Sequence, residues 1–182
     1  IENNPVDRCY LCKKYMFTKV KELAHSLGIS TILEGTNADD LKQYRPGIKA
    51  IKELGLHSPL LEANMTKKEI RELAATYGLK AANKPSSPCL ATRFPYHTLL
   101  NYEEMRKVEK IEDYLHACGF YNVRARIHND IVRLEIDQDA FMKCMDKRQE
   151  IVLFIKELGY DYVTLDLEGF RSGSQDIKLE EK

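Results

Sequence analysis

One cysteine lies in a segment of prolines and small residues, Lys84–Arg93 (KPSSPCLATR), between two differently patterned halves of the chain. A thiol becomes nucleophilic when nearby positive charge lowers its pKa, and Lys84 and Arg93 flank Cys89 in sequence. The pattern therefore predicts a reactive thiol that takes part in sulfur chemistry. A structural thiol in a packing loop is the alternative.

A second candidate site is the segment that follows the short apolar run Ile29–Leu33. The run predicts a buried parallel strand, and open α/β sheets bind ligands beyond the carboxyl ends of their strands. Glycine there permits close backbone approach, asparagine could bond a ribose or base, and aspartates could help to hold Mg²⁺. A simple turn is the alternative. The predicted nucleotide-binding residues are Gly35, Thr36, Asn37, Asp39 and Asp40.

Two alternating runs, Val123–His128 and Ile131–Ile136, predict a β-hairpin with one apolar and one mainly polar face. Arg124 and Arg126 then share a face, about 6.5–7 Å apart. A two-residue turn would place Arg126 opposite Arg133, and like charges directly opposed are destabilising. An anion among these three arginines would relieve the repulsion, which favours a phosphate site over a solvated sheet face.

The remaining patterns place these residues on elements. Helices that alternate with short apolar strands predict an α/β fold before Cys89, and a capping box, Thr66–Glu69, opens one of these helices. An α-β-β-α-β unit is predicted after Cys89. The expected helices are 7–27, 46–54, 67–77, 101–118 and 139–158, and the last strand is 162–167.

Composition limits the classes of function. The 182 residues suit one large or two small domains, and 43% hydrophobic residues suffice for a core. Acidic and basic residues number 28 each, which gives no overall field for a membrane or nucleic acid. No apolar run reaches the ~20 residues of a membrane helix. Five cysteines with irregular spacing favour a reducing cytoplasm over a disulfide framework.

Six ordered segments closely resemble the LarE family, ATP-dependent sacrificial sulfur transferases of the PP-loop (adenine nucleotide alpha hydrolase) superfamily. The Ser-Gly-Gly-x-Asp-Ser turn of that superfamily does not occur among the 182 residues. We therefore expect a chain that starts inside a larger α/β domain and does not hydrolyse ATP by itself. The segments are Arg8–Lys13, Gly35–Asp40, Tyr44–Gly47, Ser58–Leu61, Lys84–Arg93 and Gly169–Ser174.

The resemblance implies an α/β fold: a partial, Rossmann-like PP-loop domain over 1–88 and a small α+β sulfur-transfer domain over 89–182. It implies that ATP and Mg²⁺ serve to adenylate a phosphorylated pyridinium dicarboxylate mononucleotide, for synthesis of a nickel-pincer cofactor. It also implies a homo-oligomer, a hexamer. One alternative is an amidating or tRNA-thiolating PP-loop ligase, of which the tRNA version is disfavoured because a basic aromatic patch is missing. The other is a non-catalytic nucleotide-binding module.

The resemblance also implies residue roles. Cys89 would donate its own sulfur and become dehydroalanine, and Glu112 and Glu135 match acidic active-site positions of the family. The pair Arg124 and Arg126 would bind the substrate phosphate. The further residues expected to bind substrate or phosphate are Arg93, Arg133, Arg171 and Ser172.

Two features remain open at this stage. Cys9 and Cys12 form a Cys-x-x-Cys at a helix start, which could be half of a metal site or a redox pair. Because a zinc site needs four ligands and no second close pair of Cys or His occurs, a structural role is favoured. The loop around Arg171 suits an anion through its amides and hydroxyls, with a flexible turn as the alternative. The metal ligands stay unassigned.

Overall fold

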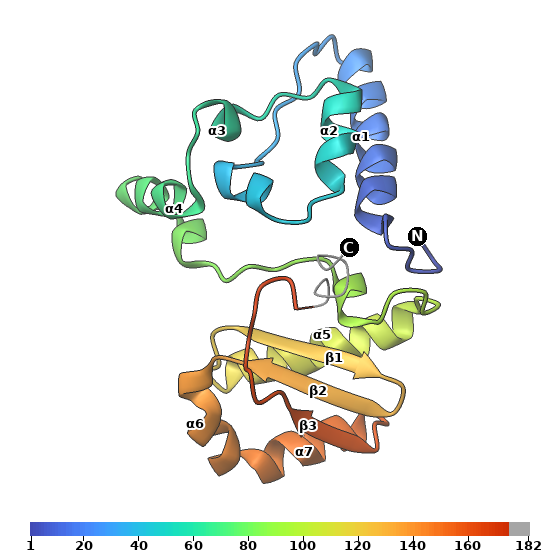
Figure 1. Cartoon of the computed structure of the whole chain (residues 1–182), viewed down its shortest axis with the longest axis vertical. Helices are drawn as coiled ribbons and strands as arrows, with labels where there is room; N and C mark the ends of the chain where they lie inside the picture. The colour runs from blue at the N-terminus through green and yellow to red at the C-terminus, as the bar shows by residue number, and fades with distance from the viewer. Residues whose placement is uncertain (175–182) are drawn as a thin grey trace. The chain divides into compact units, whose positions relative to one another are not determined.

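The computed structural model describes residues 1–174, which divide into two compact units (Figure 1). Unit 1 consists of Ile1 and Pro5–Lys84, and unit 2 of Glu2–Asn4 and Pro85–Lys182. The division lies close to the boundary expected at residues 88 and 89, while the roles assigned to the two parts stay predictions. Across the described residues, every helix is too short or too polar to cross a bilayer.

Unit 1 is built from helices and turns, and three of its helices lie where the sequence predicts them. The capping box of α4 is confirmed, because the Thr66 side chain accepts from the amide of Glu69 and the Glu69 carboxylate accepts from the amide of Thr66. The elements are α1 (Arg8–Ser26), η1 (Ala38–Lys42), α2 (Gly47–Leu54), α3 (Pro59–Glu62), α4 (Lys67–Thr76) and η2 (Lys80–Asn83).

The buried strand predicted at Ile29–Leu33 is wrong. Leu33 forms only an isolated parallel bridge with His57, and the side chains of Ile29 and Leu33 are 51% and 62% exposed. The amide of Glu34 donates to the carbonyl of His57 at 2.9 Å. An apolar run becomes a buried strand only where other segments pair with it and cover it, and within unit 1 the residues around His57 pair too briefly to do so.

Unit 2 has the α-β-β-α-β order that the sequence predicts, and the fold as a whole is mixed α/β. Strand β2 pairs antiparallel with β1 and parallel with β3. The single helix predicted over 139–158 is wrong, since the chain leaves the helix at Lys147, where the Arg148 guanidinium donates to the carbonyl of Met145. The elements are η3 (Leu90–Arg93), α5 (Tyr102–Ala117), β1 (Val123–His128), β2 (Ile131–Ile136), η4 (Gln138–Ala140), α6 (Phe141–Asp146), α7 (Arg148–Glu157) and β3 (Tyr162–Leu165).

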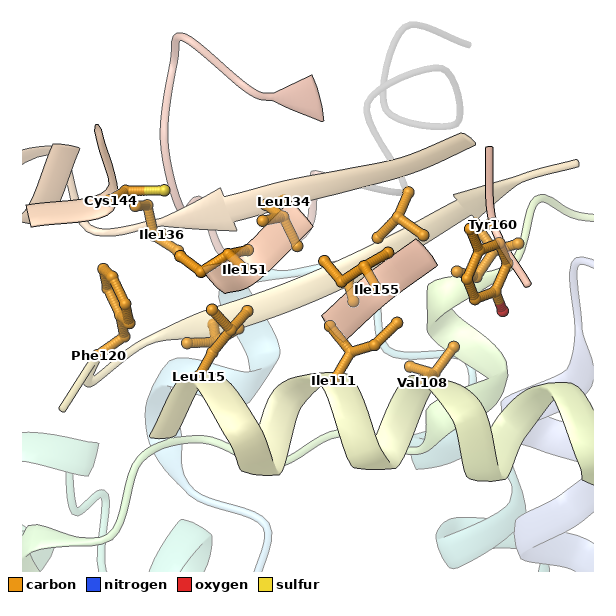
Figure 2. Packing of buried hydrophobic residues seen from close by; sticks show 14 of the residues in the cluster. Val108, Ile111, Leu115, Phe120, Leu134, Ile136, Cys144, Ile151, Ile155 and Tyr160 are labelled. Carbon is orange, nitrogen blue, oxygen red and sulfur yellow. The ribbon is translucent and has the colours of Figure 1, made fainter. Parts of the chain in front are cut away.

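One apolar cluster forms the core of unit 2. Figure 2 shows Val108, Ile111 and Leu115 of α5 pointing toward side chains of the sheet and of α7. Alternate residues of β1 and β2 supply the sheet's share, as the period-two pattern predicts. The strand and α7 residues in the cluster include Val123, Ala125, Ile127, Val132, Leu134, Ile136, Ile151 and Ile155.

Candidate functional site

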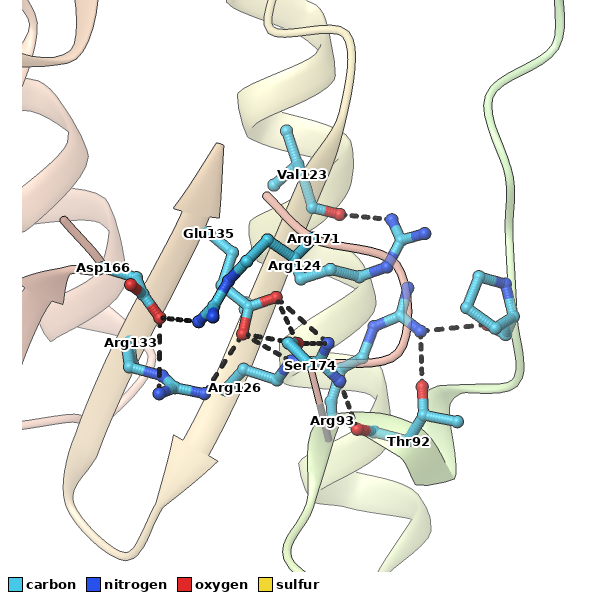
Figure 3. Close-up of polar contacts among 12 residues, drawn as sticks. Thr92, Arg93, Val123, Arg124, Arg126, Arg133, Glu135, Asp166, Arg171 and Ser174 are labelled. Carbon is cyan, nitrogen blue, oxygen red and sulfur yellow. Dashed lines mark hydrogen bonds and ion pairs between the residues drawn. The ribbon is translucent and has the colours of Figure 1, made fainter. Parts of the chain in front are cut away.

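The opposite face of the unit 2 sheet carries the predicted arginines (Figure 3). The register confirms the expected hairpin: Arg126 is paired with Arg133, and Arg124 with Glu135. Arg124 and Arg126 are each 5% exposed, and Glu135 is fully buried. This burial excludes the solvated sheet face for these three residues.

The protein itself supplies a carboxylate between the opposed arginines. Glu135 accepts from Arg126 Nε and Nη2, both at 3.0 Å, and from Arg133 Nη2 at 3.1 Å. The hydroxyl of Ser174 lies 3.0 and 3.1 Å from the two Glu135 oxygens and 2.7 Å from Arg126 Nη2. The repulsion that the sequence identifies is therefore balanced by Glu135, and a phosphate role for Arg126 and Arg133 stays a prediction.

Arg124 differs from its neighbours because it forms no ion pair with a carboxylate of residues 1–174. Its guanidinium donates to the carbonyls of Val123 at 2.5 Å and Ser86 at 2.7 Å, and lies 4.9 Å from the ring centre of Phe170. Burial, followed by repulsion from Arg93, lowers the pKa of Arg124 to about 10. The group remains a cation at neutral pH, and a buried cation of this kind suits an anionic ligand.

Arg93 and Glu112 form a second buried pair. Arg93 is 2% exposed, and its Nε and Nη2 donate to the two carboxylate oxygens of Glu112 at 2.8 and 2.7 Å. Such bidentate pairs fix the guanidinium in one orientation. Glu112 also accepts from the amide of Ala125 on β1 at 2.9 Å. The pair thus ties α5 and β1 to the turn that follows Cys89.

Cys89 is exposed, and the segment that carries it is held by arginines that donate to its carbonyls. This arrangement lies within unit 2, and it brings the buried Arg93, which the sequence places near the thiol, to the backbone of the Cys89 segment. Sequence reasoning missed the backbone role of these arginines, since Arg124 and Arg126 reach residues 38 and 34 positions away and no local signal links such residues. The bonds are Arg124 to Ser86 at 2.7 Å, Arg93 to Pro88 at 3.0 Å and Arg126 to Thr92 at 2.6 Å.

The two predicted residues of the last loop lie differently. Arg171 Nη2 is 2.7 Å from a Glu168 oxygen and 3.8 Å from an Asp166 oxygen, and Arg133 Nη1 is 3.4 Å from the same Asp166 oxygen. Ser172 is exposed. Arg171 therefore lies near Asp166, which also pairs with Arg133. Anion binding by Arg171 and Ser172 stays a prediction.

In unit 1, the predicted nucleotide segment forms the start of η1. Asn37 accepts from the amide of Asp39 at 3.0 Å, and Asp40 accepts from the amide of Asn37 at 3.1 Å. Asp39 also accepts from the amide of Lys67 at 2.9 Å, and Asp40 pairs with Arg45 at 3.1 Å. Because the turn and the helix cap use both carboxylates, Asp39 and Asp40 do not fit a Mg²⁺ site as they stand.

A carboxylate that the sequence analysis did not select, Glu34, binds the start of the same segment. It accepts from the amide and hydroxyl of Thr36 at 3.1 and 2.8 Å and from the hydroxyl of Ser58. Burial alone would raise the pKa of Glu34, but the hydrogen bonds from Ser58 and Thr36 hold it below its ordinary value. Gly35 has open space where a side chain would lie, which leaves the close approach expected there sterically open.

The remaining candidates are the cysteine pair of α1 and possible metal ligands. Cys9 and Cys12 are exposed thiols on the first turns of α1, while Cys144 is buried in unit 2. Within residues 1–174, no group of three or more His, Cys, Asp and Glu side chains is arranged to hold a metal ion.

Comparison with known proteins places the chain in a family. No family model matches it. An uncharacterized protein of Methanocaldococcus jannaschii is 32% identical over 172 residues, which cover 94% of this chain and 67% of the relative. The chain belongs to the family of that protein.

Two further members are more similar in sequence. The pyridinium-3,5-bisthiocarboxylic acid mononucleotide synthase of Lactiplantibacillus plantarum is 39% identical over 179 residues, 98% of this chain and 65% of the synthase. An uncharacterized Synechocystis protein is 39% identical over 172 residues, covering 93% of this chain and 64% of the relative. The chain spans about two thirds of the length of these family members. The synthase supports the LarE-family resemblance of the sequence motifs.

Proposed function

We propose that this protein is a sacrificial sulfur transferase that converts a pyridinium dicarboxylate mononucleotide to its thiocarboxylate. The observation that carries the proposal is the 39% identity to the named synthase over 98% of the chain. The exposed thiol of Cys89 supports it, because the carbonyls of its segment accept from buried arginines and an anionic substrate needs cations near the attacking sulfur.

The chemistry requires an activated carboxylate, which adenylation by ATP supplies. The Cys89 thiolate attacks that carbonyl carbon and displaces AMP, forming a thioester between the substrate and the cysteine. Cleavage of the Cys89 Cβ–S bond then leaves the sulfur on the substrate and dehydroalanine in the chain. Among the cations on this face, the Arg124 guanidinium is best suited to bind the substrate phosphate, since it has no carboxylate partner among the described residues.

Intact-protein mass spectrometry tests the sulfur donor. The natural full-length protein, incubated with ATP, Mg²⁺ and the dicarboxylate mononucleotide, is expected to lose the mass of H₂S, and peptide mapping is expected to place dehydroalanine at Cys89. A Cys89→Ser variant is expected to form no product, whereas Cys12→Ser, at an exposed thiol of unit 1, keeps it. Product formation with Cys89 intact would overturn the proposal.

Substrate affinity tests the anion site. Arg124→Ala is expected to weaken binding of the phosphorylated substrate more than binding of ATP, and Arg124→Lys is expected not to restore it if the contact is bidentate. The substrate without its phosphate is the matched control, because the loss at Arg124 vanishes there. Equal loss of ATP and substrate, or loss of neither, would return Arg124 to a purely structural role.

A further inference from the structure

The carbonyl oxygen of Cys89 accepts an unusual set of hydrogen bonds for a backbone group. The amide of Thr92 donates to it at 3.0 Å and closes the turn at the start of η3. Two side-chain donors join it: the hydroxyl of Thr92 at 2.8 Å and Arg93 Nη1 at 3.3 Å. Three donors therefore surround one oxygen with two lone pairs, and the charged one, Arg93 Nη1, also donates to the carbonyl of Pro88 at 3.0 Å.

The side-chain donors are fixed before any ligand binds. Arg93 is 2% exposed and clamped by both oxygens of Glu112, while its Nη1 also donates to the hydroxyl of Thr92 at 2.8 Å. Because that hydroxyl accepts from Arg93, its own hydrogen is directed to the Cys89 carbonyl. The Thr92 hydroxyl is thereby polarised by the buried cation behind it.

This oxygen is where charge develops if Cys89 loses its sulfur, a step that rests on the proposed function. A general base takes the Cα proton of Cys89, and the C–H electron pair forms a double bond to the carbonyl carbon as the C=O π pair moves onto oxygen. The oxygen pair then re-forms C=O, the enolate double-bond pair moves to form Cα=Cβ, and the Cβ–S pair leaves with sulfur. The products are dehydroalanine, the substrate thiocarboxylate and the protonated base.

We propose that Thr92 and Arg93 form an oxyanion hole for the Cys89 enolate, with Glu112 as the positioning residue that fixes Arg93. Donors held in place against a developing oxyanion stabilise it without reorganisation. This assigns Thr92 to the chemistry and gives Arg93 a role at the cysteine backbone. It also explains why a buried, bidentate ion pair lies directly behind an exposed turn.

A substrate-free reaction tests the hole independently of the proposed function. In the full-length protein, a 1,4-dibromide converts exposed thiols to cyclic sulfonium ions, which mild base eliminates to dehydroalanine. Cys12 is the internal reference, since it is also exposed but its carbonyl belongs to the hydrogen-bond ladder of α1. Peptide mass spectrometry follows elimination at each site after alkylation is complete.

Elimination is expected to be at least about tenfold faster at Cys89 than at Cys12, because removing one donor from an oxyanion hole costs about 10²–10³ in enzymes. Thr92→Val is expected to abolish most of the difference and Thr92→Ser, which keeps the hydroxyl, to retain it. Equal rates at Cys89 and Cys12, or no effect of Thr92→Val, would overturn the proposal. The alkylation rate of Cys89 and the unfolding midpoint check that Thr92→Val keeps the turn folded.

The enzymatic reaction separates this proposal from the proposed function. With ATP and substrate, Thr92→Val is expected to accumulate the Cys89–substrate thioester, with normal substrate affinity but slowed release of thiocarboxylate. If the wild-type protein never forms dehydroalanine but the sulfonium difference persists, the proposed function fails and the hole stands. If dehydroalanine forms equally fast in wild type and Thr92→Val, the hole fails and the proposed function stands.

Discussion

The two units bury very different side chains. In unit 2, branched and aromatic residues from α5, α7 and the sheet form one apolar cluster, and ionised groups are buried on the other face of the sheet. In unit 1, whose residues the structure describes throughout, the buried apolar side chains are small apart from one isoleucine. They are Ala24, Ala50, Ile51 and Ala82.

The ion pairs show the same contrast. Arg93–Glu112 and Arg126–Glu135 are buried in unit 2, whereas Lys14–Glu53 in unit 1 is exposed at both ends. Buried charges demand fixed partners, so unit 2 holds its polar groups in one arrangement. Unit 1 combines helix caps and turns with long-range polar contacts such as Lys14–Glu53, which is exposed. The difference indicates that unit 2 provides the fixed platform on which the segment around Cys89 is held.

The largest expected effect comes from a buried carboxylate. Glu135→Ala leaves Arg126 as an uncompensated buried cation, and breaking such a pair costs about 3–5 kcal/mol. Glu53→Ala, which removes an exposed carboxylate from unit 1, is expected to change stability little. The loss of unfolding free energy in each variant is measured by urea unfolding, monitored through amide hydrogen exchange in each unit. Similar losses for the two variants would contradict the contrast between the units.

The next effect compares two isoleucines of similar burial. Ile111 in unit 2 is fully buried and Ile51 in unit 1 is 3% exposed. Ile111→Ala is expected to cost about 2–5 kcal/mol through lost burial and a cavity, and Ile51→Ala less, because the other buried apolar side chains of unit 1 are alanines and form no large cluster. Ile111→Val, expected at about 0.5–1.5 kcal/mol, is the graded control for packing. An equal or larger loss at Ile51 would show that unit 1 is packed as tightly as unit 2.

The smallest effect is a pH dependence in unit 1. The pKa of Glu34 is lowered in the folded protein, so its contribution to stability is present above the ordinary carboxyl pKa and is lost as pH falls through the lower folded value. Ser58→Ala removes one of the lowering hydrogen bonds, which is expected to raise the pKa and weaken this dependence. NMR titration of the carboxyl group measures the Glu34 pKa in each variant. Ser26→Ala is the control, because the Ser26 hydroxyl donates to the Leu23 carbonyl. An unchanged Glu34 pKa in Ser58→Ala would refute the assignment.

The sequence by itself determined the elements that depend on near neighbours. Cap, proline and glycine residues at their ends predicted α1 and α2, and the Thr66–Glu69 box predicted α4. Apolar spacing predicted α5, and the two-residue turn at Asn129–Asp130 set the hairpin register. From that register the pairing of Arg126 with Arg133 followed directly. These features are local because each is decided by residues a few positions apart or directly across a turn.

Only the tertiary structure decided what covers the polar face of the sheet. Arg126 donates to the carbonyl of Thr92 and the hydroxyl of Ser174, which are 34 and 48 residues away in sequence. No period or spacing in the chain predicts such contacts. Burial also decided the outcome at Ile29–Leu33, whose apolar pattern is unchanged although its side chains are exposed. The same long-range packing turns Arg93 toward the Cys89 carbonyl, because Glu112, 19 residues along the chain, holds its guanidinium in place.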